Sequence, residues 1–256
     1  MRYGVISDVH SNLHALEAVL GTLEREGVDA IVCAGDLVGY GPHPNECVAR
    51  IASLDPAPVV IAGNHDLMAI GRLPTDDLGP LPRQTIDWTS DVLDGDARRY
   101  LEALPDSEVT GDGVVVAHGS LDDPVEYVFD AAAAAEQLAL VAERHPDARV
   151  LVLGHTHIQR AFGQDGDLAP DGEVAIGDRR WLLNAGSVGQ SRERRALARA
   201  LVLDLDRSVA RFLALDYDVR ATERDLRAAG LPEHACHLAP GRAARVRRKL
   251  KAALIN

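Results

Sequence analysis

Aspartate, histidine and asparagine side chains recur in this chain directly after short apolar runs. The five polar motifs are Asp8-Val9-His10, Gly35-Asp36, Gly63-Asn64-His65-Asp66, His118-Gly119 and Gly154-His155-Thr156-His157. Their carboxylate, imidazole and amide groups suit Mn, Fe, Zn or Co better than Ca or Mg, which prefer oxygen ligands throughout. Because no cysteine belongs to the motifs, a structural zinc site is disfavoured. The pattern therefore predicts one site that binds more than one transition-metal ion.

The apolar runs that must position these side chains read as β-strands. Arg2-Tyr-Gly-Val-Ile-Ser precedes Asp8, and similar runs occupy 30–34, 59–62, 114–117 and 150–153. In open α/β sheets, ligands bind in the crevice beyond the carboxyl ends of the strands. Side chains two residues apart on a strand share a face, so Asp8 and His10 can bind one ion, as can His155 and His157. We therefore expect the five strand ends to meet at one place.

The segments between the first strands have the spacing of apolar residues that is typical of helices. An apolar stripe from Leu13 to Leu23 predicts a helix with Ser11 or Asn12 as its N-cap and Gly27 at its end. A second helix is expected from Asn45 to Leu54. This β-α-β-α-β beginning indicates a parallel sheet with helical crossovers.

The later chain is expected to add helices and further strands. One or two helices should form an excursion at about 73–105, and Asp130 should cap an alanine-rich helix that runs to His145. The Gly- and Asp-rich stretch from Gly163 to Arg179 reads as a mobile excursion. The remaining predictions are three strands in a second sheet at Trp181–Asn184, Arg199–Leu205 and Val209–Leu215, and C-terminal helices at about 220–256.

Composition narrows the classes of partner. The formal net charge of −12 disfavours duplex nucleic acid, since phosphate contacts need Lys and Arg. The basic cluster from Arg242 to Lys251 reads as the solvated face of a terminal helix. No apolar stretch reaches the roughly 20 residues of a membrane span, so we expect no membrane partner.

The N-terminal residues and the cysteines bear on the cellular compartment in which the protein is expected. Met1 leads directly into the first strand, without a signal peptide, and the three cysteines have no CxxC spacing. We therefore expect a cytoplasmic protein with reduced thiols. A homo-oligomer is compatible with the sequence. His14 and His43 lie near the metal motifs in the sequence but not at strand ends. We therefore favour ordinary histidines over residues that support the metal ligands.

The five motifs together resemble the calcineurin-like metallophosphoesterase superfamily, whose pattern is D-x-H, G-D, G-N-H-D/E, H and G-H-x-H. The resemblance covers about residues 1–160, and the stretch from Asn184 to Gln190 is similar to N-P-G-S-V-G-Q in the small bacterial YfcE-like branch, with Ala185 in place of proline. It implies a four-layer α/β/β/α sandwich with two facing mixed β-sheets. We expect residues 1–256 to form a single domain of this kind.

The resemblance also implies roles for individual residues. It implies Asp8, His10 and His157 as ligands of one metal, Asn64, His118 and His155 as ligands of the other, and Asp36 as the bridge. Two such ions could generate a bridging hydroxide and stabilise an in-line displacement at phosphorus. Mn is the preferred ion, and Fe, Zn and Co are the alternatives. His65 would be the general acid, with Asp66 fixing its tautomer and orientation.

The substrate class is the least determined part of the sequence interpretation. We expect a hydrolase of small phosphodiesters or phosphomonoesters, including nucleotides, with Arg192 and Arg194 as candidates for contacting the phosphate. Protein Ser/Thr phosphatases carry arginines after G-D and G-N-H-E, whereas Leu37 and Leu67 occupy those places here. The alternatives are a protein phosphatase, a nuclease, which the net acidity disfavours, and a non-catalytic scaffold, which the complete motifs disfavour.

Overall fold

Two six-stranded mixed sheets form the centre of the computed structural model, which describes residues 1–163, 166–168 and 172–240. Sheet A has the strand order β3 (Val59–Val60), β2 (Ala30–Cys33), β1 (Arg2–Ile6), β11 (Ala198–Asp204), β12 (Val209–Leu215) and β9 (Glu173–Ala175). Sheet B has the order β4 (Ser107–Val109), β5 (Val114–Ala117), β6 (Val150–Leu153), β10 (Trp181–Asn184), β7 (Arg160–Gly163) and β8 (Gly166–Leu168). The pairs β1·β2, β2·β3, β5·β6 and β6·β10 are parallel, and the remaining pairs are antiparallel.

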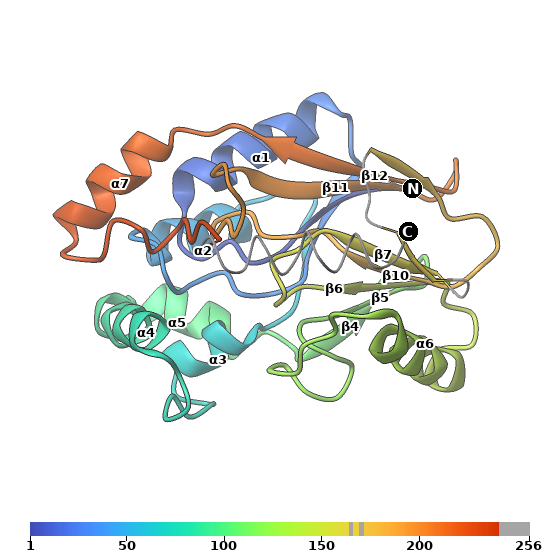
Figure 1. Ribbon diagram of the computed structural model, residues 1–256, viewed down its shortest axis with the longest axis horizontal. Coiled ribbons are helices and arrows are strands. Elements are labelled where there is room, and N and C mark those ends of the chain that lie inside the picture. The colour runs from blue at the N-terminus through green and yellow to red at the C-terminus, as the bar shows by residue number, and fades with distance from the viewer. Residues whose placement is uncertain (164–165, 169–171, 241–256) are drawn as a thin grey trace.

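Alternation along the strands produces three apolar layers. In β5, Val114 and Val116 face a core shared with sheet A, whereas Val115 and Ala117 face the core beneath α6 (Ala131–Arg144). Because both faces of these strands are buried, they read as continuous apolar runs in the sequence. Figure 1 shows the two sheets stacked, with α1 (Leu13–Arg25) outside one and α6 outside the other. The expected four-layer α/β/β/α fold is confirmed.

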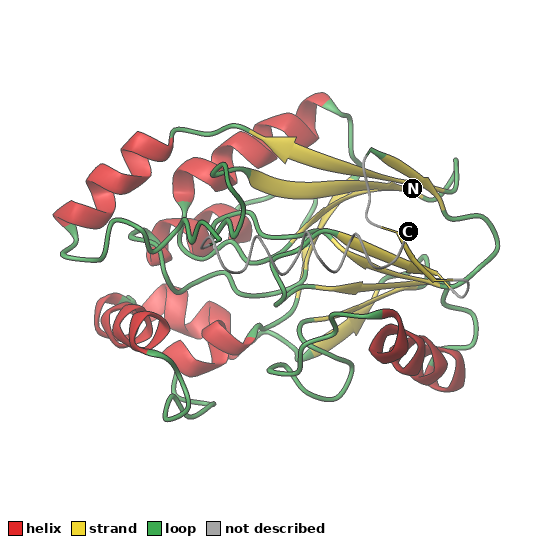
Figure 2. Cartoon of the chain, viewed as in Figure 1, coloured by secondary structure: helices red, strands yellow, loops and turns green. Residues whose placement is uncertain are grey.

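The remaining helices lie near the strand ends. Helices α3 (Asn64–Ala69), α4 (Pro80–Val92) and α5 (Gly95–Glu102) gather beyond one end of the strands (Figure 2), and α2 (Pro44–Ala52) follows β2. Helix α7 (Val219–Ala228) contacts α1. None of the helices in the described part of the chain is long and apolar enough to span a membrane.

Helix termini match the capping predictions. The Asn12 side chain accepts a hydrogen bond from the Ala15 amide at the start of α1, and Gly27 follows the end of that helix with a φ of +65°. Asp130 caps α6 through the amides of Ala132 and Ala133. The helical excursion at about 73–105 is confirmed as α4 and α5.

Two sequence expectations are wrong. The strands β10, β11 and β12 do not form a sheet of their own, because β10 adds to β6 while β11 pairs with the open edge of β1. The described part of the Gly- and Asp-rich stretch contains β8 and β9, which extend one edge of each sheet. Gly and Asp are poor strand formers, so pairing with a neighbouring edge decides the structure there. The expected terminal helix and its basic cluster, 242–251, lie outside the described residues.

Candidate metal centre

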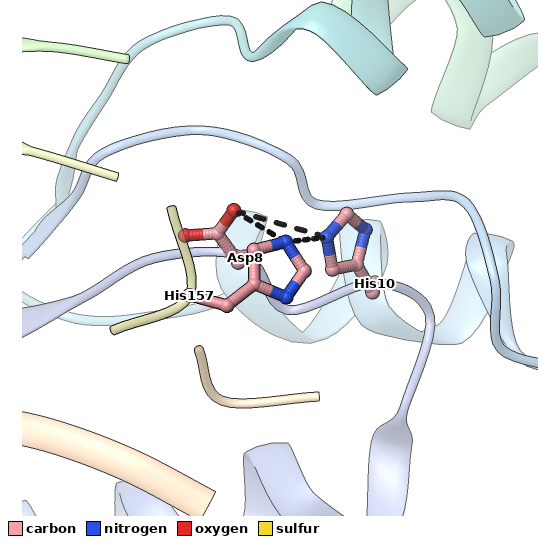
Figure 3. A group of neighbouring side chains, drawn as sticks. All are labelled: Asp8, His10 and His157. Atoms are coloured by element: carbon pink, nitrogen blue, oxygen red, sulfur yellow. Dashed lines mark hydrogen bonds and ion pairs between the residues drawn. The ribbon is translucent and has the colours of Figure 1, made fainter. Parts of the chain in front are cut away.

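The carboxyl ends of β1 and β6 bring the first three predicted ligands together. The Nε2 atoms of His10 and His157 are 3.1 Å apart, and Asp8 Oδ1 lies 3.3 Å from His157 Nε2 and 3.8 Å from His10 Nε2. Figure 3 shows the carboxylate and the two imidazole nitrogens turned toward a common point. All three side chains are buried, so little water competes for these groups.

The ends of β2, β3, β5 and β6 supply a second group. His118 Nε2 lies 3.0 Å from Asn64 Oδ1 and 3.3 Å from Asp36 Oδ2. Ligand atoms of Asp36, His118 and His155 all lie within 4.8 Å of one another. The structure therefore brings all seven predicted ligand side chains to one place.

Asp36 lies between the two groups. Its Oδ1 accepts a hydrogen bond of 2.8 Å from the His65 amide. Its Oδ2 is buried without a hydrogen-bond partner and lies 3.6 Å from His10 Nε2 and 3.3 Å from His118 Nε2. A buried carboxylate oxygen without a hydrogen bond is costly, and cations beside it, whether a protonated His118 or metal ions, would offset that cost.

Backbone carbonyls prepare the four histidines for metal binding. In each ring one nitrogen lies 2.6–3.1 Å from a carbonyl oxygen, so that nitrogen carries the proton and the other keeps its lone pair for a metal. The pairs are His10 Nδ1 with Val38, His118 Nδ1 with Ala34, His155 Nε2 with Val125, and His157 Nδ1 with Gln190. The donor set thus fits transition-metal ions.

Burial and mutual charge move the pKa values of these groups in opposite directions. Burial raises the pKa of Asp8 to about 7 and lowers that of His155 to about 3. Burial alone would lower the pKa of His118, but the neighbouring Asp36 carboxylate outweighs it and raises that pKa to about 9. Burial alone would likewise raise the pKa of Asp36, but His118 and His65 hold it well below its usual range. Without metal, the second group therefore contains an imidazolium–carboxylate pair.

Five of the seven predicted ligand residues have left-handed backbone conformations. The φ values of Asp8, His10, Asp36, His155 and His157 lie between +48° and +63°. Such conformations are uncommon for residues other than glycine and cost about 1–3 kcal/mol each, so they persist where surrounding structure enforces them. Strain of this kind concentrates at functional sites, and here it turns successive side chains of the loops toward the same point.

Two motif glycines are required by close approach to the carboxylates. A Cβ on Gly63 would lie 2.1 Å from Asp36 Oδ1, and one on Gly154 would lie 2.0 Å from Ser7 Oγ and 3.0 Å from Asp8 Oδ2. The glycines thus allow neighbouring strand ends to pack against the ligand residues.

His65 is adjacent to both groups but differs from the other four histidines. Its ring packs edge-on against His10 at a centroid distance of 4.8 Å, and its buried Nδ1 has no hydrogen-bond partner. Burial lowers its pKa. Among the described contacts, the His65 ring has no carbonyl partner like those of the other four histidines.

The Asp66 carboxylate, which the resemblance implied as the group that orients His65, contacts backbone amides in the structure. Its two carboxylate oxygens accept hydrogen bonds from the amides of Val38 and Gly63, at 3.0 and 2.9 Å. These bonds connect the loop after β2 to the start of α3. Asp66 therefore positions the backbone that carries Asp36, Asn64 and His65, and no hydrogen bond links its carboxylate to the His65 ring among the described contacts.

A cavity of about 510 Å³ opens over the centre. Its lining includes five residues of the candidate centre and an apolar group: Asp36, Asn64, His65, His155 and His157, and Met68, Leu73, Pro74 and Leu78. Arg192 also lines it, with Nη2 3.3 Å from His157 Nε2 and Nε bonded to Gln190 Oε1 at 3.0 Å. Arg194 is exposed and is not among the described residues lining the cavity, so the structure offers its assignment no support.

Sequence reasoning missed two tyrosines at this site. Tyr127 stacks on His155 at a centroid distance of 3.9 Å, and Tyr40 packs edge-on against His10 at 4.7 Å. Tyr40 lies four residues after Asp36, and its nearness to that motif in the sequence could have indicated a place at the site. Tyr127 belongs to a loop between β5 and α6 whose course no local pattern indicates.

Comparison with known proteins agrees with this geometry. Residues 1–208 match the model of the calcineurin-like phosphoesterase superfamily domain. The chain is 32% identical to the protein MJ0912 from Methanocaldococcus jannaschii, over 90% of this chain and 93% of that one.

Solved structures lead to the same family. The crystal structure of a metallophosphoesterase from Sphaerobacter thermophilus is 37% identical, with a TM-score of 0.80 over 92% of this chain and 96% of that one. The hypothetical protein PH1004 from Pyrococcus horikoshii OT3 shares the fold, with a TM-score of 0.75 at 20% identity and the same coverage of 92% and 96%. The chain belongs to the calcineurin-like phosphoesterase superfamily, and this membership identifies it as a metal-dependent hydrolase of phosphate esters.

Proposed function

We propose that this phosphoesterase is a dinuclear enzyme that hydrolyses small phosphodiesters or phosphomonoesters, nucleotides among them. The observation that carries the proposal is Asp36 Oδ2, a buried oxygen without a hydrogen bond that lies between two groups of potential ligand atoms. Ions held on either side of that oxygen would supply an activated water and positive charge opposite a phosphate. Mixed imidazole, carboxylate and amide ligands favour Mn, with Fe, Zn and Co as alternatives.

The proposal assigns distinct tasks to the protein's own residues. Asp8, His10 and His157 would hold one ion, Asn64, His118 and His155 the other, and Asp36 both. His65 would protonate the departing oxygen. Burial lowers its pKa, but an anionic phosphate facing the ring favours the imidazolium and would raise that pKa again. Asp66 would hold the backbone of both motif loops.

The cavity supports a small ester as the substrate. Its volume of about 510 Å³ accommodates a molecule of nucleotide size, and the apolar group in its lining suits an organic substituent. Arg192 is the residue we propose for contacting the phosphate. Because Leu37 and Leu67 replace the arginines of protein Ser/Thr phosphatases, phosphoproteins are the disfavoured alternative.

A metal-supplemented substrate comparison tests the function. Metal-free protein would be restored with Mn, Fe, Zn or Co and assayed on a bis-aryl phosphodiester, nucleotides and a phosphoserine peptide. We expect Mn to restore most activity and the first two substrate classes to exceed the peptide. Faster peptide hydrolysis would support a protein phosphatase, and no turnover with any metal would support a scaffold.

The proposal also covers the compartment, the domain organisation, the partners and the oligomeric state of the chain. Cys33, Cys47 and Cys236 are free and buried, which suits the reducing cytoplasm. We also propose that the chain forms a single domain over 1–256 and that it hydrolyses its substrate without nucleic acid or membrane partners. Sedimentation of the purified protein would test for the homo-oligomer that the sequence allows.

A further inference from the structure

A second cluster of metal-binding side chains lies outside the candidate centre. His14 belongs to α1, His43 precedes α2, and Asp225 belongs to α7. Their ligand atoms all lie within 4.8 Å of one another. Because three elements that are distant in the sequence contribute one residue each, the cluster depends on the tertiary fold and not on a local turn.

The two imidazoles converge on one carboxylate oxygen. Asp225 Oδ2 lies 2.7 Å from His14 Nε2 and 3.3 Å from His43 Nε2. The two rings meet edge to face at a centroid distance of 5.6 Å. Zinc bonds of about 2.0–2.2 Å in tetrahedral geometry separate ligand atoms by roughly 3.3–3.5 Å. The His43 contact already has that spacing, and the His14 contact needs less than about 1 Å of side-chain movement to reach it.

The cluster is accessible, unlike the candidate centre. The side chains of His14, His43 and Asp225 are 33%, 21% and 37% exposed. A metal ion can therefore enter from solvent, and water can complete its coordination.

The structure assigns to His14, His43 and Asp225 a third metal site, of a kind that binds Zn²⁺ or Co²⁺ through two imidazoles, one carboxylate and water. The ion crosslinks α7 to α1 and to the segment before α2. Thr222 of α7 also donates to Asn12 Oδ1, and Asn12 caps α1 two residues after His10. The site therefore stabilises the packing of α7 beside the metal-bearing loop.

The site is weaker than the candidate centre for a specific reason. His43 Nδ1 is buried and has no hydrogen-bond partner, so no carbonyl fixes the tautomer of that ring. Loss of such a supporting partner typically costs 10–100-fold in metal affinity. We expect zinc to dissociate from this site at free concentrations at which the buried centre stays loaded.

The test is a comparison of zinc content and melting temperature. Full-length wild-type protein, His14→Gln and Asp225→Asn would be equilibrated with buffered Zn²⁺, and bound zinc would be counted by mass spectrometry of the native protein. Each variant should bind one zinc fewer per chain than wild type, and the thermal shift that zinc causes at this site should disappear. His234→Gln, a change at an exposed histidine after α7, is the matched control and should behave as wild type.

The readout is a difference between proteins with the same centre, so it is independent of how many ions the centre holds and of any activity. Melting curves of the metal-free proteins report whether a substitution has damaged the fold, and His14→Gln retains a side-chain donor for Asp225. Equal zinc content and equal zinc-dependent shifts in wild type and His14→Gln would overturn the third site.

Discussion

Asp36, the proposed bridging ligand, is the residue on which the dinuclear proposal depends most. Asp36→Asn keeps the shape of the side chain but removes its negative charge, and both proposed ions share that charge. We expect metal content to fall at both positions and hydrolysis to fall by more than the ~10–100-fold typical of losing a supporting partner. Metal analysis and turnover of an aryl phosphodiester would check this, and full activity with one ion or in a chelator would contradict it.

The proposed role of His65 predicts a bias that depends on the leaving group. General acid catalysis contributes about 10²–10⁴-fold and matters most when the departing oxygen is a poor leaving group. His65→Asn should keep both metals, lose that factor on an alkyl ester such as a nucleotide diester, and lose much less on a nitrophenyl ester. Rates on both substrates at equal metal loading test this. Equal losses would leave His65 as a phosphate-binding or structural residue.

Asp66 provides the comparison for that experiment. Its carboxylate accepts the amides of Val38 and Gly63, so Asp66→Ala leaves two buried donors without partners. Each such donor costs about 1–3 kcal/mol. We expect lower stability and similar losses on both leaving groups, measured by denaturant unfolding and the same two assays. A leaving-group bias equal to that of His65→Asn would instead support the orienting role that the sequence suggested.

Metal binding should release a proton from one particular histidine. The Asp36 carboxylate raises the pKa of His118 to about 9, so this ring is protonated at pH 7 without metal, whereas His155, with a pKa near 3, is already neutral. A ligand imidazole must be neutral, so binding expels the His118 proton. Metal affinity should therefore rise with pH until about 9.

Calorimetry in buffers of different ionisation enthalpy measures this release. The component from His118 should be present at pH 7 and disappear as the pH passes 9. Asp8, whose pKa is about 7, adds a second component that disappears above about pH 8, before the His118 component does. Protons lost by water at the metals would persist above pH 9, so the pH dependence separates the three sources. Absence of any pH-dependent release between pH 7 and pH 10 would contradict the imidazolium–carboxylate pair.

At the scale of elements, α1 connects the site to the rest of the fold. Its cap, Asn12, accepts from the Ala15 amide and Thr222 Oγ1 and donates to the Gly189 carbonyl at 2.9 Å. Asn12→Ala should lower the free energy of unfolding by about 1–3 kcal/mol, combining a lost cap with an unpaired carbonyl. It should also reduce activity, since His10 precedes this cap. Denaturant unfolding and turnover would measure both effects.

Asp94 supplies a matched control for that substitution. It caps α5 through the amides of Asp96 and Ala97, is exposed, and is not among the described residues that line the cavity. Asp94→Ala should cost about 1 kcal/mol of stability and leave activity unchanged. Similar activity losses in both variants would indicate a general effect of destabilisation.

The elements also explain what the sequence could and could not predict. The strands before Asp8, Asp36 and His118 are buried on both faces, so their apolar runs and the polar residues after them are readable locally. The assignment of β10 to sheet B and of β11 to sheet A depends on which strand edges are open, which is a property of the assembled sheets. The carbonyls of Val38 and Val125 that orient the histidines are equally invisible, because every residue has a carbonyl.

At the scale of the whole molecule, the net charge of −12 makes a prediction about substrate size. Electrostatic repulsion raises the energy of bringing polyanionic DNA to the cavity, whereas a small ester carries little charge and the metals attract it locally. At low ionic strength, kcat/KM should therefore be far higher for a nucleotide diester than for duplex DNA.

Added salt screens the repulsion, since the Debye length falls from about 30 Å at 0.01 M to about 10 Å at 0.1 M. The rate on DNA should then rise, while that on the small ester changes little. A nuclease that contacts phosphates through Lys and Arg shows the opposite dependence, because salt opposes counterion release. Rates on both substrates across that range would decide between them, and a fall on DNA with salt would restore the nuclease interpretation.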